Sequence, residues 1–204
     1  MRRIPLSRRS HVIGFQVLPG GVTEHESALE RDFVTLATFA DPLATITPQP
    51  ITLHFCHAGL PRRYTPDYLV RWSSGLVELV EVKYRTDLRE QWERLRPAFV
   101  AARSWCKERG AKFRIATDRS IRGVRLANVK RLLPLRTAHL DAAEVAQVYA
   151  LVAASNTTTL ASLVSALPGD RATTLGTIWR MIARGALRVD LRAPIDMNAS
   201  VALA

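Results

Sequence analysis

Two carboxylates and a lysine lie on either side of a predicted β-turn: Asp67, Glu81 and Lys83. The mean position of Asp67 and Glu81 is 74, which falls within the turn Ser73-Ser74-Gly75, so a symmetric hairpin makes the two acids cross-strand neighbours. Such neighbours have Cβ atoms roughly 4.5–5.5 Å apart. Two carboxylates at that separation repel each other unless a cation lies between them, and hard oxygen ligands at that spacing suit Mg²⁺.

Lys83 lies two residues after Glu81 and therefore points to the same face of the strand. Its ammonium group would lie beside the metal, where it can polarise an attacking water or stabilise charge on a pentacovalent phosphate. Glu78, Glu81 and Lys83 interrupt the otherwise apolar strand LVELVEVK, and buried ionisable groups are costly unless they are paired or metal-bound. The alternative interpretation is an amphipathic strand with exposed charges, and Asp67 as a turn residue after Pro66.

A third carboxylate is expected on the preceding helix. Glu30 is the first choice and Glu26 the second. The stretch Ser27-Ala28-Leu29-Glu30 also fits a capping box, in which Glu30 would serve the helix end and not the metal. Spacing alone leaves both interpretations open.

The elements that must position these residues follow from hydrophobic periodicity and turn signals. Residues 1–23 are expected to form a basic arm or loop whose Arg2, Arg3, Arg8 and Arg9 either reach DNA or remain disordered. The expected core elements, in chain order, are a helix over 24–40, strands over 51–56, 64–72 and 76–83, a helix over 88–108 that Pro97 kinks or splits, a strand over 112–117 and a helix over 126–133. This order predicts an α/β fold with a mixed sheet flanked by helices, in a domain over residues 24–136.

The composition changes after residue 140. Helical patterns over 142–154, 158–167 and 171–184 precede the stretch GALRVDL, which suggests a β pair. Three helices followed by a two-stranded wing is the outline of a winged-helix domain, expected over residues 141–204.

The bulk composition is that of a globular protein, with 48% apolar and 23% charged residues. The chain has no apolar run of the eighteen or so residues needed to span a membrane and no signal-peptide pattern, so we expect a cytoplasmic protein. Cys56 and Cys106 fit neither a disulfide framework nor a zinc spacing. His54 and His57 flank Cys56, and the three together could suggest a metal site. His54 and Cys56 lie in the apolar run ITLHFC, however, where alternation predicts a strand.

The formal net charge is +11, which is the electrostatic footprint of a polyanion binder. Residues 1–140 hold 24 Lys and Arg against 13 Asp and Glu, whereas residues 141–204 hold five of each. Arg outnumbers Lys 25 to 4. The planar guanidinium group of Arg suits phosphate oxygens, which would explain this excess of Arg over Lys. Codon bias in a GC-rich genome is the alternative explanation. The neutral C-terminal segment favours protein contact over DNA contact there.

The chain resembles the TnsA family over about residues 24–133, on the stretches ESALERDFVTLATF, RRYTPDYLVRW, LVEVKYR and ATDRSIR and on Gln49-Pro50. TnsA proteins are endonuclease subunits of heteromeric cut-and-paste transposases, and they belong to the PD-(D/E)xK nuclease superfamily. The resemblance implies a restriction-endonuclease-like fold in a bacterial protein. It also implies that Glu30, Asp67 and Glu81, together with Val82, ligate Mg²⁺, for which Mn²⁺ can substitute, and that Lys83 is the catalytic lysine.

The resemblance further implies the partners. In that family the enzyme cuts double-stranded DNA at the 5′ ends of the transposon, a separate DDE transposase cuts and joins the 3′ ends, and an AAA+ ATPase regulator is the third partner. Two other functions stay open at this stage. One is a stand-alone restriction or repair nuclease of the same fold, and the other is a DNA-binding regulator whose nuclease domain is inactive.

Overall fold

The computed structural model describes residues 14–18, 21–25, 27–155 and 158–204. The predicted Arg2, Arg3, Arg8 and Arg9 contacts and the alternative acid Glu26 lie outside these residues. Contacts divide the chain into two units, Met1–Arg122 and Gly123–Ala204. Within the described residues, no helix is long and apolar enough to cross a membrane.

The first unit is built on a four-stranded mixed sheet in the order β3-β6-β7-β8. Strands β3, β6 and β7 are antiparallel, and β8 adds to β7 in parallel. The bounds of these strands are β3 Thr45–Pro48, β6 Tyr68–Arg71, β7 Val77–Lys83 and β8 Lys112–Thr117. The mixed α/β sheet expected from the sequence is confirmed.

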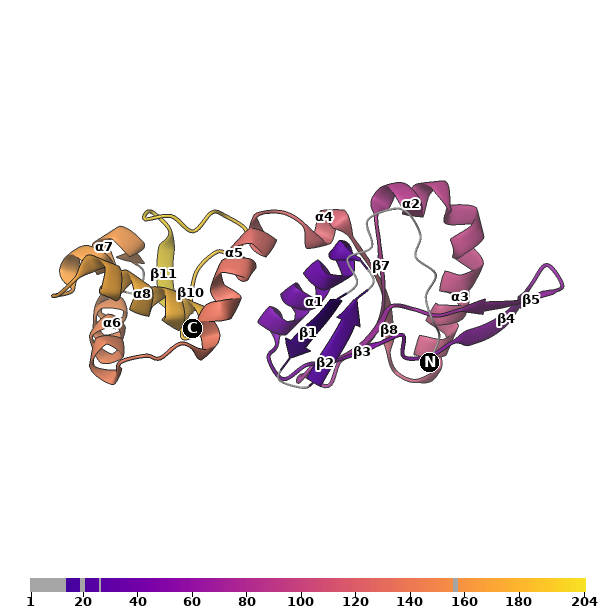
Figure 1. The fold of residues 1–204 in the computed structure, drawn as a ribbon, viewed down its shortest axis with the longest axis horizontal. Helices are drawn as coiled ribbons and strands as arrows, with labels where there is room; N and C mark the ends of the chain where they lie inside the picture. Colours follow the sequence, from indigo (N-terminus) through magenta and orange to yellow (C-terminus); the bar gives the residue numbers. More distant parts are fainter. Residues whose placement is uncertain (1–13, 19–20, 26, 156–157) are drawn as a thin grey trace. The chain divides into compact units, whose positions relative to one another are not determined.

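Two long helices cover the faces of this sheet, and Figure 1 shows the sheet between them. Helix α1, Ala28–Ala40, packs Phe33 against Tyr68 with ring centroids 5.7 Å apart. Helix α3, Trp92–Glu108, covers the opposite face, where the register partners Leu69 and Leu79 meet Ala102. Because successive strand residues alternate between faces, Tyr68 and Val80 face α1. Leu69, Leu79 and Glu81 face α3.

Several elements differ from the sequence-based expectation. Residues assigned to an arm and to the start of the first helix form a hairpin of β1, Gly14–Leu18, and β2, Gly21–His25, and α1 begins only after its N-cap, Ser27. The expected long helix breaks at Gln91 into α2, Arg85–Glu90, and α3, whereas Pro97 lies inside α3 without ending it.

The region before β6 also holds two strands that lie mainly between the expected elements. Strand β3 includes Pro48, which an edge strand tolerates because its outer side makes no ladder hydrogen bonds. Between the strands expected over 51–56 and 64–72, β5, Leu60–Tyr64, pairs with β4, Leu53–His57, in an antiparallel hairpin. This hairpin extends beyond α3 in Figure 1.

The second unit contains the expected helices and a small sheet. Helices α6, Ala142–Ser155, α7, Leu160–Ala166, and α8, Arg171–Ala183, accompany a three-stranded antiparallel sheet ordered β10-β11-β9. The strands are β9 Thr158–Thr159, β10 Leu187–Arg188 and β11 Ser200–Leu203.

The second unit also takes in the segment that follows the short helix α4, Asp118–Ile121. Helix α5, Val124–Leu132, and the 3₁₀ helix η1, Leu133–Thr137, pack against α8, and the Arg136 side chain donates to the Ala183 carbonyl at 2.9 Å. The division therefore lies earlier in the chain than the boundary suggested near residues 136–141. The domain types assigned to these segments stay predictions.

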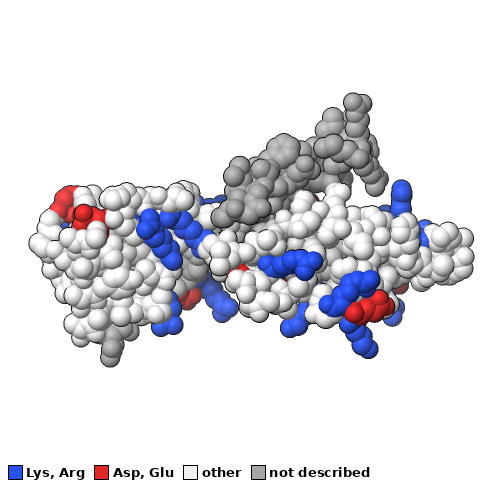
Figure 2. Space-filling model, turned by 90° about the horizontal axis from the view of Figure 1, so that it is seen from below, with Lys and Arg blue, Asp and Glu red and all other residues white. Residues whose placement is uncertain are grey.

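The division changes the distribution of charge between the parts of the chain. Residues 1–122 hold 20 Lys and Arg against 13 Asp and Glu, and residues 123–204 hold 9 against 5. Both units are therefore basic, because α5 and η1 bring four cations with them. In the view of Figure 2, Lys and Arg recur over the surface, and Asp and Glu occupy small areas. The charge argument for protein contact held only for residues 141–204 and does not extend to the whole second unit.

Candidate active site

The turn between β6 and β7 fixes the register that the sequence predicted. The Trp72 N–H donates to the Leu76 carbonyl at 2.9 Å, and Gly75 adopts a positive φ of 84°. Tyr68 pairs with Val80, so the pairing continued by one residue places Asp67 opposite Glu81. The predicted register is confirmed, and it brings the two acids to the same end of the hairpin.

Asp67 lies just outside the paired part of β6 and turns its side chain towards β7. Its Oδ2 accepts the Val82 N–H at 2.6 Å, and its own carbonyl accepts the Gln49 N–H at 2.7 Å. An extended strand directs the N–H and C=O of one residue to the same edge. The Val82 carbonyl therefore also faces the side on which Asp67 lies.

Glu81 is the most deeply buried acid of the set, with 3% of its surface exposed. Its two carboxylate oxygens have different partners: Oε2 accepts the Tyr64 hydroxyl at 2.6 Å, and Oε1 accepts the Lys83 ammonium at 2.9 Å. Tyr64 is held in turn by an edge contact with Phe99, with ring centroids 6.0 Å apart. A buried carboxylate is thus satisfied by one neutral and one charged donor.

Lys83 is a quarter exposed and points to the same face as Glu81, as its spacing predicted. Burial by itself lowers the pKa of Lys83, but the nearby carboxylates of Glu81, Asp67 and Asp87 outweigh it and raise the pKa above its ordinary value. The lysine therefore stays a cation at neutral pH. It can donate hydrogen bonds and stabilise negative charge, but it cannot act as a base there.

Glu30 lies in the first turn of α1. Its backbone N–H donates to the Ser27 hydroxyl at 3.1 Å, and the Ser27 hydroxyl donates to Glu30 Oε1 at 2.8 Å. Ser27 is therefore the N-cap of α1, which is one half of the predicted capping box. The second oxygen of Glu30 accepts the Tyr68 hydroxyl at 3.4 Å, which links the helix to β6 next to Asp67.

The three carboxylates influence one another electrostatically. Burial, followed by the charges of Glu81 and Glu30, raises the pKa of Asp67 well above its ordinary value, despite the opposing effects of the Val82 N–H and Lys83. Excess negative charge is thus concentrated at this end of the sheet. Within the described residues, no three His, Cys, Asp or Glu side chains are gathered closely enough to form a ready-made metal-binding group.

A family model described as TnsA-like endonuclease N terminal matches residues 42–118. This segment is therefore similar to the N-terminal domain of TnsA-like endonucleases. No curated protein matches the chain.

The TnsA-like segment contains Asp67, Glu81, Val82 and Lys83, whereas Glu30 precedes it. The structure joins the first four through hydrogen bonds of the β6–β7 end, and it connects Glu30 to them through Tyr68 and through its charge. Their roles as metal ligands and catalytic groups stay predictions. Glu78, the other acid of β7, is satisfied outside the site by Trp72 and Arg114.

Two features of the first unit were missed in the sequence. Tyr64 was noted only as part of Tyr64-Thr65-Pro66-Asp67, yet it is a direct partner of Glu81. Asp32, 4% exposed, forms ion pairs with Arg31 at 3.4 Å and with Arg122 at 3.7 Å. An acid two residues after Glu30 on a helix gives no periodic signal for burial, so only the packing of α1 could reveal it.

Proposed function

We propose that this chain is a Mg²⁺-dependent DNA endonuclease that cuts the 5′ ends of a transposon as one subunit of a heteromeric transposase. The observation that carries the proposal is the hydrogen bond from the Val82 N–H to Asp67, beside the buried Glu81–Lys83 ion pair. Together, these two interactions bring Asp67, Glu81, the Val82 main chain and Lys83 to one end of the sheet. The TnsA-like family of residues 42–118 supports nuclease chemistry on DNA.

The residues fit a hard divalent cation. Carboxylate and carbonyl oxygens are the ligands that Mg²⁺ prefers. Burial, and then the charges of Glu81 and Glu30, raise the pKa of Asp67, and a bound cation would relieve the repulsion between these carboxylates. Asp67, Glu81 and the Val82 carbonyl would hold the ion, with Glu30 as the acid contributed by α1. When bound, Mg²⁺ would supply Lewis-acid stabilisation of the phosphoryl oxygens.

The chain's own residues have separate tasks in this scheme. Glu81 now shares its carboxylate between Tyr64 and Lys83, so an ion on Glu81 would compete with Lys83 for Oε1. The released ammonium group of Lys83 would then donate to the attacking water or to the phosphate. The ordinary lysine pKa of about 10.4 is sufficient to keep this group cationic at neutral pH. Tyr64 would keep Glu81 oriented through Oε2.

The second unit and the partners complete the proposal. Helices α6–α8 with strands β9–β11 are consistent with a winged-helix domain. We assign it to contacts with a DDE transposase and an AAA+ regulator, the partners expected for a TnsA-type subunit. Specificity for the transposon end would come from the transposase, which raises the effective concentration of the nuclease at one phosphodiester.

The decisive experiment compares four variants of the full chain on a 5′-labelled duplex with Mg²⁺ and the partner transposase. Asp67→Ala, Glu81→Ala and Lys83→Ala should each abolish strand cleavage, whereas Glu78→Ala should retain it. Glu78 is the matched control because it is an acid of the same strand whose partners lie outside the site. Wild-type cleavage rates in the Asp67 or Glu81 variant would refute the assignment.

Dependence on assembly separates this proposal from a stand-alone restriction or repair nuclease. We expect the isolated chain to cut poorly until the transposase and the transposon ends are present. The same assay without the partner tests this expectation. Equal, sequence-specific cutting by the isolated chain would favour the stand-alone enzyme.

A further inference from the structure

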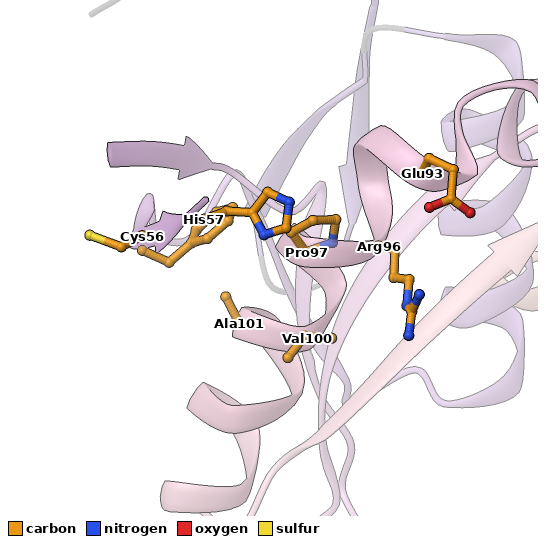
Figure 3. A pocket seen from close by; sticks show the side chains of 8 residues that line it. Cys56, His57, Glu93, Arg96, Pro97, Val100 and Ala101 are labelled. Carbon is orange, nitrogen blue, oxygen red and sulfur yellow. The ribbon is translucent and has the colours of Figure 1, made fainter. Parts of the chain in front are cut away.

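A groove lies between the β4–β5 hairpin and the first half of α3. One part of it, about 550 Å³, is lined from β4 by Phe55, Cys56 and His57 and from α3 by Glu93, Arg96, Pro97, Val100 and Ala101. In Figure 3, His57 of the strand points towards the helix at Pro97, whereas Cys56 points away from it. A second part, about 450 Å³, shares four of these residues and adds Arg62, Arg63 and Tyr64 from β5 and Arg94 from α3.

The groove is basic. Four arginines line it, Arg62, Arg63, Arg94 and Arg96, against one acid, Glu93. All four arginines are exposed. Among the described residues, the side chains of Arg62, Arg63 and Arg96 have no hydrogen-bonded or ion-paired partner, and the side chain of Arg94 donates to Gln91. Guanidinium groups held out to solvent in this way match phosphate oxygens in shape and charge.

The groove is connected to the candidate active site by Tyr64. This residue ends β5 and lines the groove, and its hydroxyl donates to the buried Glu81 at 2.6 Å. Arg62 lies two residues earlier on the same strand, about 7 Å along it. Asp67 follows three residues after Tyr64. A chain of phosphates that runs along the groove would therefore arrive at the carboxylates.

We propose that the basic groove between the β4–β5 hairpin and α3 binds the phosphate backbone of duplex DNA and leads it to the Asp67–Glu81 end of the sheet. This inference rests on the proposed function, for which it names the surface that holds the substrate. Phosphate backbone is the occupant favoured over an acidic peptide, because the charges follow a strand that continues directly into the site.

The test measures equilibrium binding of the full chain to a fluorescent 25-base-pair duplex in EDTA, where cleavage does not occur, at several salt concentrations. Each phosphate contact contributes about 0.9 to the slope of log K against log salt. Arg62→Ala/Arg63→Ala should therefore reduce the magnitude of the slope by about 2. If the plots of log K against log salt for wild type and the double variant meet at 1 M salt, the double variant binds about 60-fold more weakly than wild type at 0.1 M salt.

The matched control is Arg103→Ala/Lys107→Ala. It removes the same charge from exposed positions of α3 that do not line the groove. Arg62→Lys/Arg63→Lys should keep most of the salt slope, since the charges remain. The inference is overturned if wild type does not bind duplex DNA, if Arg62→Ala/Arg63→Ala binds like wild type, or if the control variant loses as much affinity.

An acidic protein segment as the occupant would give its own result. The arginine variant would then keep its DNA affinity and lose binding to the purified partner transposase, which also overturns the inference. The failure of the proposed function has a different signature. Wild type would bind DNA with the slope that depends on Arg62 and Arg63, yet would not cut it with Mg²⁺ and the transposase present.

Discussion

The hydrogen bond between Tyr64 and Glu81 gives the sharpest prediction about what holds the site together. Tyr64→Phe keeps the ring that contacts Phe99 and removes only the hydroxyl. Glu81 is 3% exposed, so water cannot readily replace the lost donor, and Oε2 is left without this 2.6 Å bond. Hydrogen bonds to charged groups contribute about 1.5–3 kcal/mol. We expect Tyr64→Phe to lower the free energy of unfolding by about 2 kcal/mol.

The assay is urea denaturation of the metal-free chain in EDTA at neutral pH. At an m-value of about 1.5 kcal/mol/M, the expected loss moves the midpoint of the first unit down by about 1.3 M. Tyr149→Phe is the control, because Tyr149 is 39% exposed on α6 and its hydroxyl can be solvated. That variant should stay within about 0.5 kcal/mol of wild type. A Tyr64→Phe protein as stable as the Tyr149 control would refute the reasoning.

Three further substitutions test other parts of the molecule. Because the pKa of Asp67 is raised by folding, its contribution to stability is complete below the ordinary Asp pKa of about 3.9 and is lost as pH rises through the folded value. In the metal-free chain, the melting temperature of Asp67→Asn should therefore increase relative to that of wild type as pH rises from 5 to 9. A difference between the two melting temperatures that does not change with pH would contradict this. Asp32→Ala should lower the free energy of unfolding in urea by only about 1 kcal/mol, because its partners Arg31 and Arg122 are half exposed and solvent screens the two ion pairs. Asn128→Ala should lower the stability of the second unit by about 2 kcal/mol, since the 3% exposed amide donates to two backbone carbonyls, and an unchanged urea midpoint would argue against that role.

The local sequence pattern was sufficient to predict the structure where one hydrophobic period and one turn determine it. The β6–β7 hairpin has a turn at Ser73-Ser74-Gly75 between two largely apolar stretches, so its register followed from counting residues out from the turn. Ser27 was recognisable as an N-cap from its spacing to Glu30. The helices of the second unit likewise followed from their 3.6-residue period.

Local pattern was misleading where neighbours in space decide the structure. Strand β3 contains Pro48 and reads as a turn, but pairing with β6 on one side makes it an edge strand. The residues LPRRY of β5 carry no apolar alternation, because most of the hairpin surface is exposed and its pairing with β4 supplies the order.

For the candidate site, the sequence by itself determined which residues share one sheet end, because period and register are properties of adjacent chain segments. Only the tertiary structure decided what those residues touch. Tyr64 reaches Glu81 because β5 and α3 bring its ring against Phe99, and Glu30 approaches Asp67 because Phe33 packs α1 on Tyr68. These contacts join residues far apart in the chain through buried packing, and packing has no signature in local spacing.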